Sequence, residues 1–123
     1  MKRCPLICLM AASLACLAGE PGSSWLHKVP PGFRALENPL SSDPDATRAG
    51  AKLFQHHCSA CHGQDAQGIE KAPALRSPVV RDASPGSLYW LLRNGILRRG
   101  MPAWSHLPDQ QRWQIITWLK NIQ

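Results

Sequence analysis

The stretch that most constrains this chain is Cys58-Ser59-Ala60-Cys61-His62, in which two thiols three positions apart are followed at once by an imidazole. On one helical turn, two such thiols can add to the two vinyl groups of a haem, while the adjacent ring nitrogen binds the iron from one side. The motif therefore predicts one c-type haem, bound covalently through Cys58 and Cys61, with His62 as the proximal iron ligand.

Two other uses of paired cysteines fit the sequence less well. A Cys-x-x-Cys redox site usually accompanies a βαβ pattern, and no strand pattern flanks this pair. A structural zinc site usually takes four ligands, commonly from two such pairs. The remaining cysteines, Cys4, Cys8 and Cys16, all lie in the apolar N-terminal stretch and offer no second pair in a mature chain.

Residues 1–18 have the features of an export signal. Lys2 and Arg3 precede an apolar run, and Cys16 and Ala18 offer small residues at the positions that a signal peptidase inspects. The run is short for a membrane span, so a retained anchor is the less favoured alternative. Cleavage before Cys16 and acylation of its thiol is a second alternative, which would tether the protein to a membrane. Export predicts a location in the periplasm or on the outer face of the bacterial membrane.

Residues 19–42 are rich in proline and glycine, and this composition predicts a linker without regular structure. However, Trp25, Leu26 and Phe33 are too apolar for a purely solvated tether. We expect the segment to lie against the following domain as a strap, with docking on a partner protein as the alternative.

Residues 43–123 carry helical patterns and predict an all-α haem domain with three to four helices. The first helix is expected to begin with Asp43 as N-cap and Pro44 at the first helical position, and to run into the haem motif. A second helix is expected from Ser84 to Asn94. A last one should begin near Pro108 and run almost to the end of the chain, with a broad apolar face.

Gly50 lies in the interior of the first expected helix, where glycine costs about 1 kcal/mol relative to alanine. A close crossing with another helix would explain it. Together with features spread along residues 44–123, it makes the chain resemble the class I cytochrome c family. The resemblance implies the cytochrome c fold around one covalent haem, with the first and last helices crossing at Gly50 against Trp118. The matching residues are Gly50, Phe54, Cys58, Cys61, His62, Pro73, Leu75, Met101, Pro102, Trp118 and Leu119.

Met101 is the expected distal iron ligand. It is the one methionine outside residues 1–18, and it precedes a proline in a loop rather than lying on an apolar helical face. His106 is the alternative ligand. A thioether favours reduced iron and raises the reduction potential. We further expect a backbone carbonyl near Pro73 to accept a hydrogen bond from the second ring nitrogen of His62.

With both axial positions filled, the site predicts electron transfer and not an enzyme. We expect a single-electron carrier of a respiratory chain, which passes electrons from a periplasmic dehydrogenase or quinol-oxidising complex to a terminal oxidase or another cytochrome. One alternative is a dedicated haem subunit of one dehydrogenase, docked through residues 25–33. Another is a small haem peroxidase or gas sensor in which the Met101 ligand is labile.

The charge of the chain suggests what kind of partner it meets. The formal net charge is +6, and removal of residues 1–18 takes away Lys2 and Arg3 and no acid, which leaves +4. Arg93, Arg98 and Arg99 closely precede Met101 in the sequence. They either form an ordinary solvated surface or steer redox partners with acidic docking surfaces. The charges form no helix-long basic stripe, so nucleic acid is not an expected partner. Outside a complex, we expect a monomer.

Overall fold

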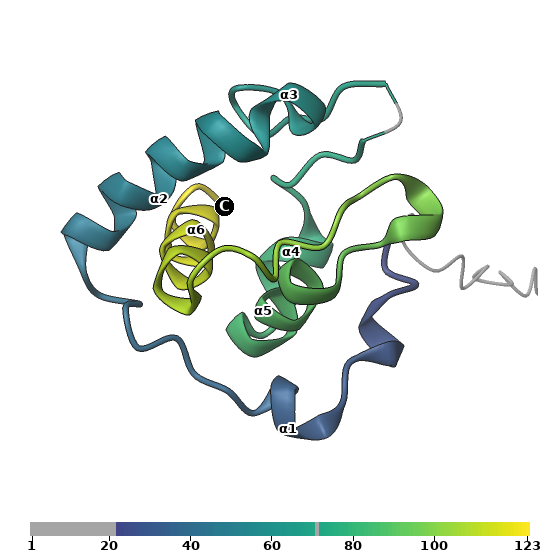
Figure 1. The fold of residues 1–123 in the computed structure, drawn as a ribbon, viewed down its shortest axis with the longest axis horizontal. Coiled ribbons are helices and arrows are strands. Elements are labelled where there is room, and N and C mark those ends of the chain that lie inside the picture. Colours follow the sequence, from purple (N-terminus) through teal and green to yellow (C-terminus); the bar gives the residue numbers. More distant parts are fainter. Residues whose placement is uncertain (1–21, 71) are drawn as a thin grey trace, which may run out of the picture.

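The computed structural model describes residues 22–70 and 72–123, so the predicted export signal lies outside the described residues. In these residues the chain forms six α-helices and two 3-10 helices, and its β-structure is limited to two isolated bridges. Figure 1 shows that the helices run in several directions and are joined by loops. The all-α architecture expected from the sequence is confirmed. No helix in this part of the chain is long and apolar enough to cross a bilayer.

The three long helices lie where the sequence predicts them. They are α2 (Pro44–His57), α5 (Pro85–Asn94) and α6 (Asp109–Asn121). Helix α2 begins because the Asp43 side chain accepts a hydrogen bond from the amide of Asp45 at 2.8 Å. Helix α5 begins in the same way, since Ser84 Oγ accepts from the amide of Ser87 at 3.1 Å. Local capping thus determines where the helices that frame the site begin.

Helices α2 and α6 cross at Gly50, as the resemblance implies. Gly50 is buried, and a Cβ atom there would overlap the carbonyl group of Gln114 and lie 2.9 Å from Cβ of Trp118. One turn further on, the fully buried Phe54 ring packs on Trp118 with 4.4 Å between the ring centroids. In Figure 1, α6 is seen almost end-on beside α2. The glycine is needed because the two backbones approach more closely than any side chain would allow.

Two short helices, η1 (Leu26–Lys28) and α1 (Pro31–Arg34), lie in the segment where the sequence analysis expects no regular structure. For α1, proline does not prevent a helix, because Pro31 stands at its first position, where a missing N–H has no partner to lose. The segment folds against the rest of the chain. Trp25 and Val29 are only 6% and 2% exposed and belong to the hydrophobic core.

The strap is also fastened to α5 and α6 by specific contacts. A Cβ atom at Gly86 of α5 would overlap the carbonyl oxygen of Phe33, so the strap backbone passes directly over this glycine. The buried Asn38 donates to Thr117 Oγ1 at 2.9 Å. In the structure, residues 22–42 are therefore part of the packed domain.

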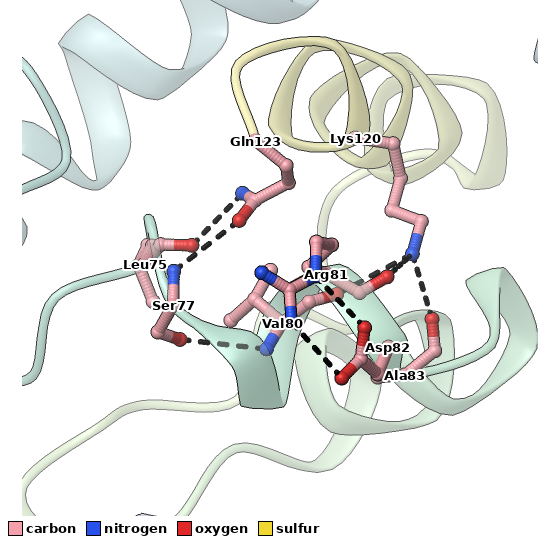
Figure 2. Close-up of polar contacts among 8 residues, drawn as sticks. All are labelled: Leu75, Ser77, Val80, Arg81, Asp82, Ala83, Lys120 and Gln123. Carbon is pink, nitrogen blue, oxygen red and sulfur yellow. Dashed lines mark hydrogen bonds and ion pairs between the residues drawn. The ribbon is translucent and has the colours of Figure 1, made fainter.

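The remaining short helices are α3 (Ser59–His62), α4 (Pro78–Asp82) and η2 (Leu97–Arg99). Helix α4 is held by Lys120 of α6, whose ammonium group donates to the carbonyl oxygens of Arg81 and Ala83 at 2.5 and 2.8 Å (Figure 2). Burial lowers the pKa of Lys120. A lysine at this position satisfies carbonyls that the end of a short helix would leave without partners.

Candidate haem-binding site

The thiol pair and the imidazole are brought together where α2 gives way to α3. Cys58 closes α2, with its amide donating to the carbonyl of Phe54 at 2.8 Å, and its own carbonyl accepts from the amide of His62 at 3.0 Å. Gly63, with φ of +81°, then ends α3. Cys58, Cys61 and His62 thus lie within a single turn, which is the placement that the motif predicts.

The two thiols differ in their surroundings. Cys58 is half-buried and packs against the hydrophobic core, whereas Cys61 is exposed, and both are free. Burial, with a smaller contribution from Cys61, raises the pKa of the Cys58 thiol to about 12. The pair therefore faces apolar surroundings on one side and solvent on the other, which suits a planar group with one buried edge and one accessible edge.

The imidazole of His62 is oriented by a backbone carbonyl. Its Nδ1 atom lies 2.9 Å from the carbonyl oxygen of Pro73, which confirms the predicted contact. A carbonyl can only accept, so Nδ1 carries the proton and donates it in this contact. The Nε2 atom then keeps its lone pair free for a metal, and the hydrogen bond makes that nitrogen a better donor to it.

Gly68 allows the Pro73 carbonyl to come this close. Its φ is +84°, and a Cβ atom there would lie 2.7 to 2.9 Å from backbone atoms of residues 72–74. Its amide donates to the carbonyl of His62 at 2.8 Å, and the amide of Leu75 donates to the carbonyl of Ala66 at 2.8 Å. The loop after α3 therefore folds back on itself and presents an acceptor to the imidazole.

Met101 lies in the loop that follows η2, the light green loop in Figure 1. Two backbone hydrogen bonds join it to Ile96, from the amide of Ile96 at 3.0 Å and from its own amide at 3.2 Å. Its side chain is half-buried and packs against the hydrophobic core. Gly95, with φ of +66°, ends α5 and lets Pro102 approach closely. The loop thus holds the thioether at the edge of the core.

Arg112 of α6 is a site residue that the sequence analysis did not find. It is 4% exposed, and its Nη1 atom donates to the carbonyl oxygens of Trp104, Ser105 and Leu107 at 3.1, 3.1 and 2.6 Å. These carbonyls belong to the segment directly after Met101. The one signal in the sequence is that a charged residue at position 112 shares the helical face of the apolar residues at 115, 116 and 119.

The remaining histidines near the site pack around one indole. The centroid of the His57 ring lies 5.2 Å from that of Trp104, and the centroid of the His106 ring lies 5.4 Å from that of the same Trp104. His56 is exposed and lies next to His57, with 4.5 Å between the ring centroids. Burial, followed by the charges of His56 and His106, lowers the pKa of His57. His106, the alternative ligand, contacts the indole.

The arginines expected around Met101 occupy different environments. Arg98 and Arg99 are exposed on η2, beside Leu97, which is 71% exposed. Across residues 22–70 and 72–123, the ion pairs found do not involve these two arginines. Arg93 instead stacks over the Phe33 ring of the strap, 5.9 Å from the ring centroid. The charge next to the Met101 loop is therefore unneutralised and comes from η2.

The donors fit a haem c. The chain offers two free thiols on one turn, an imidazole with its Nε2 lone pair available, and a half-buried thioether on a separate loop. Such a group would be held by Cys58 and Cys61 and ligated by His62 and Met101. In the described part of the chain, no cluster of three or more His, Cys, Asp or Glu side chains is arranged to hold a metal ion.

The chain is similar to known proteins over this region. Residues 45–119, which include both thiols, the imidazole and the thioether, match the family described as cytochrome c oxidase, cbb3-type, subunit III. The fold is similar to that of cytochrome cL from the marine methylotrophic bacterium Methylophaga aminisulfidivorans MPT, with 30% identity and a TM-score of 0.60. That match covers 69% of this chain and 58% of the cytochrome cL chain, so this chain spans less than two thirds of its relative.

Proposed function

Because this chain belongs to the class I family of c-type cytochromes and is an electron-transfer haem protein with the cytochrome c fold, we propose that it is a single-electron carrier. In this proposal one haem c is bound covalently through Cys58 and Cys61, with His62 and Met101 as the axial ligands. When bound, the haem supplies an iron that changes its charge by one electron. The protein contributes the attachment, the two ligands and the surface that partners meet.

The observation that supports this proposal most strongly is the hydrogen bond from His62 to the Pro73 carbonyl. His62 itself lies in the same turn as both thiols. An imidazole fixed in this tautomer is preorganised as a ligand, and such contacts are typical of histidines that bind metals. The structure around Met101 is consistent with its role as the second ligand, since its loop is closed by the bridge to Ile96 and its side chain packs against the core. Two occupied axial positions leave the iron no place for a substrate.

Replacement of Met101 by alanine tests the ligand set. Loss of the thioether removes a ligand that favours reduced iron, so the reduction potential should fall by on the order of 0.1 V or more. The long-wavelength absorption band of ferric iron with sulfur ligation should disappear, and the ferrous protein should bind carbon monoxide. His106→Gln is the control and should leave band and potential unchanged. Wild-type protein that lacks the band and binds carbon monoxide readily would favour the peroxidase or gas-sensor alternative.

We place the carrier between a periplasmic dehydrogenase or quinol-oxidising complex and a terminal oxidase or another cytochrome. An oxidase acceptor is supported by the description of the matching family, and export by the pattern of residues 1–18. The strap bears on the alternative of a dedicated subunit docked through residues 25–33. Because Trp25 and Val29 pack into the core of this same domain, they are not free to contact another protein. This favours a free carrier over a subunit that docks through these residues, and we propose that the carrier is a monomer outside its complexes.

We further propose that partners dock on η2 through an acidic surface. Arg98 and Arg99 carry charge that no ion pair in the described residues neutralises, and Leu97, next to them in η2, is the most exposed large apolar side chain found there. Charged residues around an apolar centre speed encounter and then allow close contact. The bridge from Ile96 to Met101 places this surface directly beside the loop of the distal ligand.

Salt dependence tests the docking surface. The bimolecular rate with a redox partner should fall as ionic strength rises to about 0.15 M, where the screening length is about 8 Å. Arg98→Glu/Arg99→Glu should lower the rate at low salt by about tenfold or more and flatten its salt dependence. Lys52→Glu, an exposed charge on α2, is the matched control and should have a smaller effect. A rate that does not depend on salt would contradict this proposal.

A further inference from the structure

We propose that Arg112 is a positioning residue for Met101, and that its guanidinium sets how readily the thioether leaves the iron. This inference rests on the proposed ligation by His62 and Met101. It goes further because it assigns control of the distal ligand to a side chain on α6, outside the loop that carries the ligand. The contacts of Arg112, its burial and its unmet hydrogen-bonding capacity all support it.

The first step is the set of hydrogen bonds to the ligand loop. The Nη1 atom of Arg112 donates to three carbonyl oxygens, those of Trp104, Ser105 and Leu107. The first of these residues follows Met101 by three positions and the last by six. Nη1 carries two N–H groups, so the three carbonyls share them, and hydrogen bonds from a charged donor contribute about 1.5 to 3 kcal/mol for each N–H group. The guanidinium therefore holds this segment strongly.

The second step is that Arg112 is itself held rigidly. Its Nη2 atom donates to the hydroxyl of Tyr89 at 3.0 Å and pairs with Asp109, and its guanidinium lies 5.0 Å from the Tyr89 ring centroid. The Tyr89 ring stacks on Trp113 with 4.3 Å between centroids. The guanidinium is therefore anchored on α5 and α6, and the loop is tied to the core and not to a mobile side chain.

The third step concerns the cost of this arrangement. Arg112 Nε is buried and has no hydrogen-bond partner within the described residues. A buried donor without a partner costs about 1 to 3 kcal/mol, and burial of the charge adds to that. The chain keeps this residue in α6 although an apolar side chain would suit a face that also carries Ile115 and Ile116. The contacts to the loop offset that cost.

Few other hydrogen bonds within the described residues hold the segment that carries the ligand. They are the bridge from Met101 to Ile96, the Trp104 amide to the Leu92 carbonyl at 2.7 Å, and the Leu107 amide to the Trp104 carbonyl at 3.1 Å. In this proposal, release of the thioether would require the segment after Met101 to move away from the core, which would separate its carbonyls from Arg112. The guanidinium would therefore favour the closed state of the loop, in which Met101 can act as a ligand.

Lysine cannot replace this residue, and that makes Arg112→Lys the informative variant. In the guanidinium, Nη1 meets the three carbonyls while Nη2 meets the Tyr89 hydroxyl and Asp109. An ammonium has its three donors at one atom, so a lysine cannot hold the loop and stay anchored on Tyr89 at the same time. The charge is kept and the geometry is lost. Arg48→Lys is the matched control, since Arg48 also pairs with an aspartate three residues earlier, Asp45, but its side chain is 70% exposed and touches no ligand loop.

The experiment measures how easily imidazole displaces the thioether from the ferric holoprotein. For Arg112→Lys we expect the apparent affinity for imidazole to rise by about tenfold or more, with a lower reduction potential, because the loop opens more readily. Arg48→Lys should leave both unchanged. An Arg112→Lys protein that is less stable to denaturant but has wild-type imidazole affinity and potential would overturn the inference, because the residue would then be merely structural.

Failure of the ligation and failure of the inference are distinguishable. If the wild-type protein lacks the sulfur-to-iron band, the proposed ligand set is wrong, and the inference falls with it. If the Arg112→Lys variant does not bind haem and fold, the inference can still be tested on the wild-type holoprotein. Saturating imidazole should then speed hydrogen exchange at the Arg112 guanidinium and the Trp104 amide. Equal exchange rates with and without imidazole would overturn the inference.

Discussion

The two segments that carry the proposed ligands are held in different ways. The proximal segment, residues 58–76, is closed by its own backbone: the His62 amide bonds to Cys58, the Gly68 amide bonds to His62, and the imidazole bonds to Pro73. The distal segment, residues 95–107, has its own bridge and short turns, but its second half is held mainly from other helices, by the Leu92 carbonyl of α5 and by Arg112 of α6.

This difference predicts that the two ligands have different freedom. On the proximal side, the acceptor, the imidazole and both thiols move as one unit, because the hydrogen bonds that join them link residues that are close in sequence. On the distal side, the loop can detach while the helices stay folded, since the contacts that hold it come from α5 and α6. Local opening of this kind is characteristic of segments with few ties to the core. Exchange of ligands should therefore occur on the distal side.

The largest expected effect is a difference in stability between alanine variants of one glycine from each segment. Gly68 and Gly100 both have positive φ, +84° and +83°, but a Cβ atom at Gly68 would strike the backbone of residues 72–74, whereas at Gly100 it would meet nothing within 4 Å. Gly68→Ala should thus cost about 2 to 4 kcal/mol, from backbone strain and from displacement of Pro73. Gly100→Ala should cost only about 1 kcal/mol, from strain alone. Denaturant unfolding of the holoproteins measures both values.

The same pair of variants checks the imidazole contact. If Gly68→Ala pushes the Pro73 carbonyl away, the His62 ring loses its acceptor, and the reduction potential should change along with stability. Gly100→Ala should leave that contact intact. Equal losses of stability for the two variants would show that the proximal loop is not as closely packed as the comparison requires.

A smaller effect is expected from the tie between the proximal segment and α6. Figure 2 shows the Gln123 side chain bridging the carbonyl of Leu75, at 2.9 Å, and the amide of Ser77, at 3.2 Å. Because Gln123 is exposed, Gln123→Ala should lower the free energy of unfolding by only about 0.5 to 1 kcal/mol. Gln110→Ala, an exposed glutamine in the first turn of α6, is the control. If the two variants lose the same stability, this tie does not support the proximal segment.

The sequence predicts best those parts of the structure that depend on residues close in sequence. The starts of α2 and α5 are predicted because each depends on a cap and a proline within a few residues, Asp43 with Pro44 and Ser84 with Pro85. The contact between His62 and a carbonyl near Pro73 is predicted because it lies within one short loop. The crossing at Gly50 is a long-range contact, yet it is predicted because a glycine inside a helix is unfavourable without such a reason.

The parts that the sequence does not predict depend on contacts between distant residues. Helices η1 and α1 form in a proline-rich segment because Trp25 and Val29 find a core to pack on, which local composition does not indicate. Arg112 bonds to Tyr89, 23 positions away, and to carbonyls, which leave no trace in a side-chain pattern. Every residue offers a backbone acceptor, so the sequence does not indicate which carbonyls a buried arginine will bind.

The smallest expected effect lies where the two segments touch. His57 is the last residue of α2, just before the thiol pair, and packs against Trp104 of the distal segment with 5.2 Å between the ring centroids. Burial, then the neighbouring His56 and His106, lowers the pKa of His57 below its ordinary value near 6.5. The unfolded chain thus binds more protons than the folded one just below pH 6.5, so stability should decline as pH falls through that window. His57→Gln should make this decline shallower, as measured by denaturant unfolding of the holoprotein from pH 7 to pH 5. His27→Gln, an exposed residue of η1, is the control, and equal pH profiles for the two variants would show that His57 does not couple protonation to the contact between the segments.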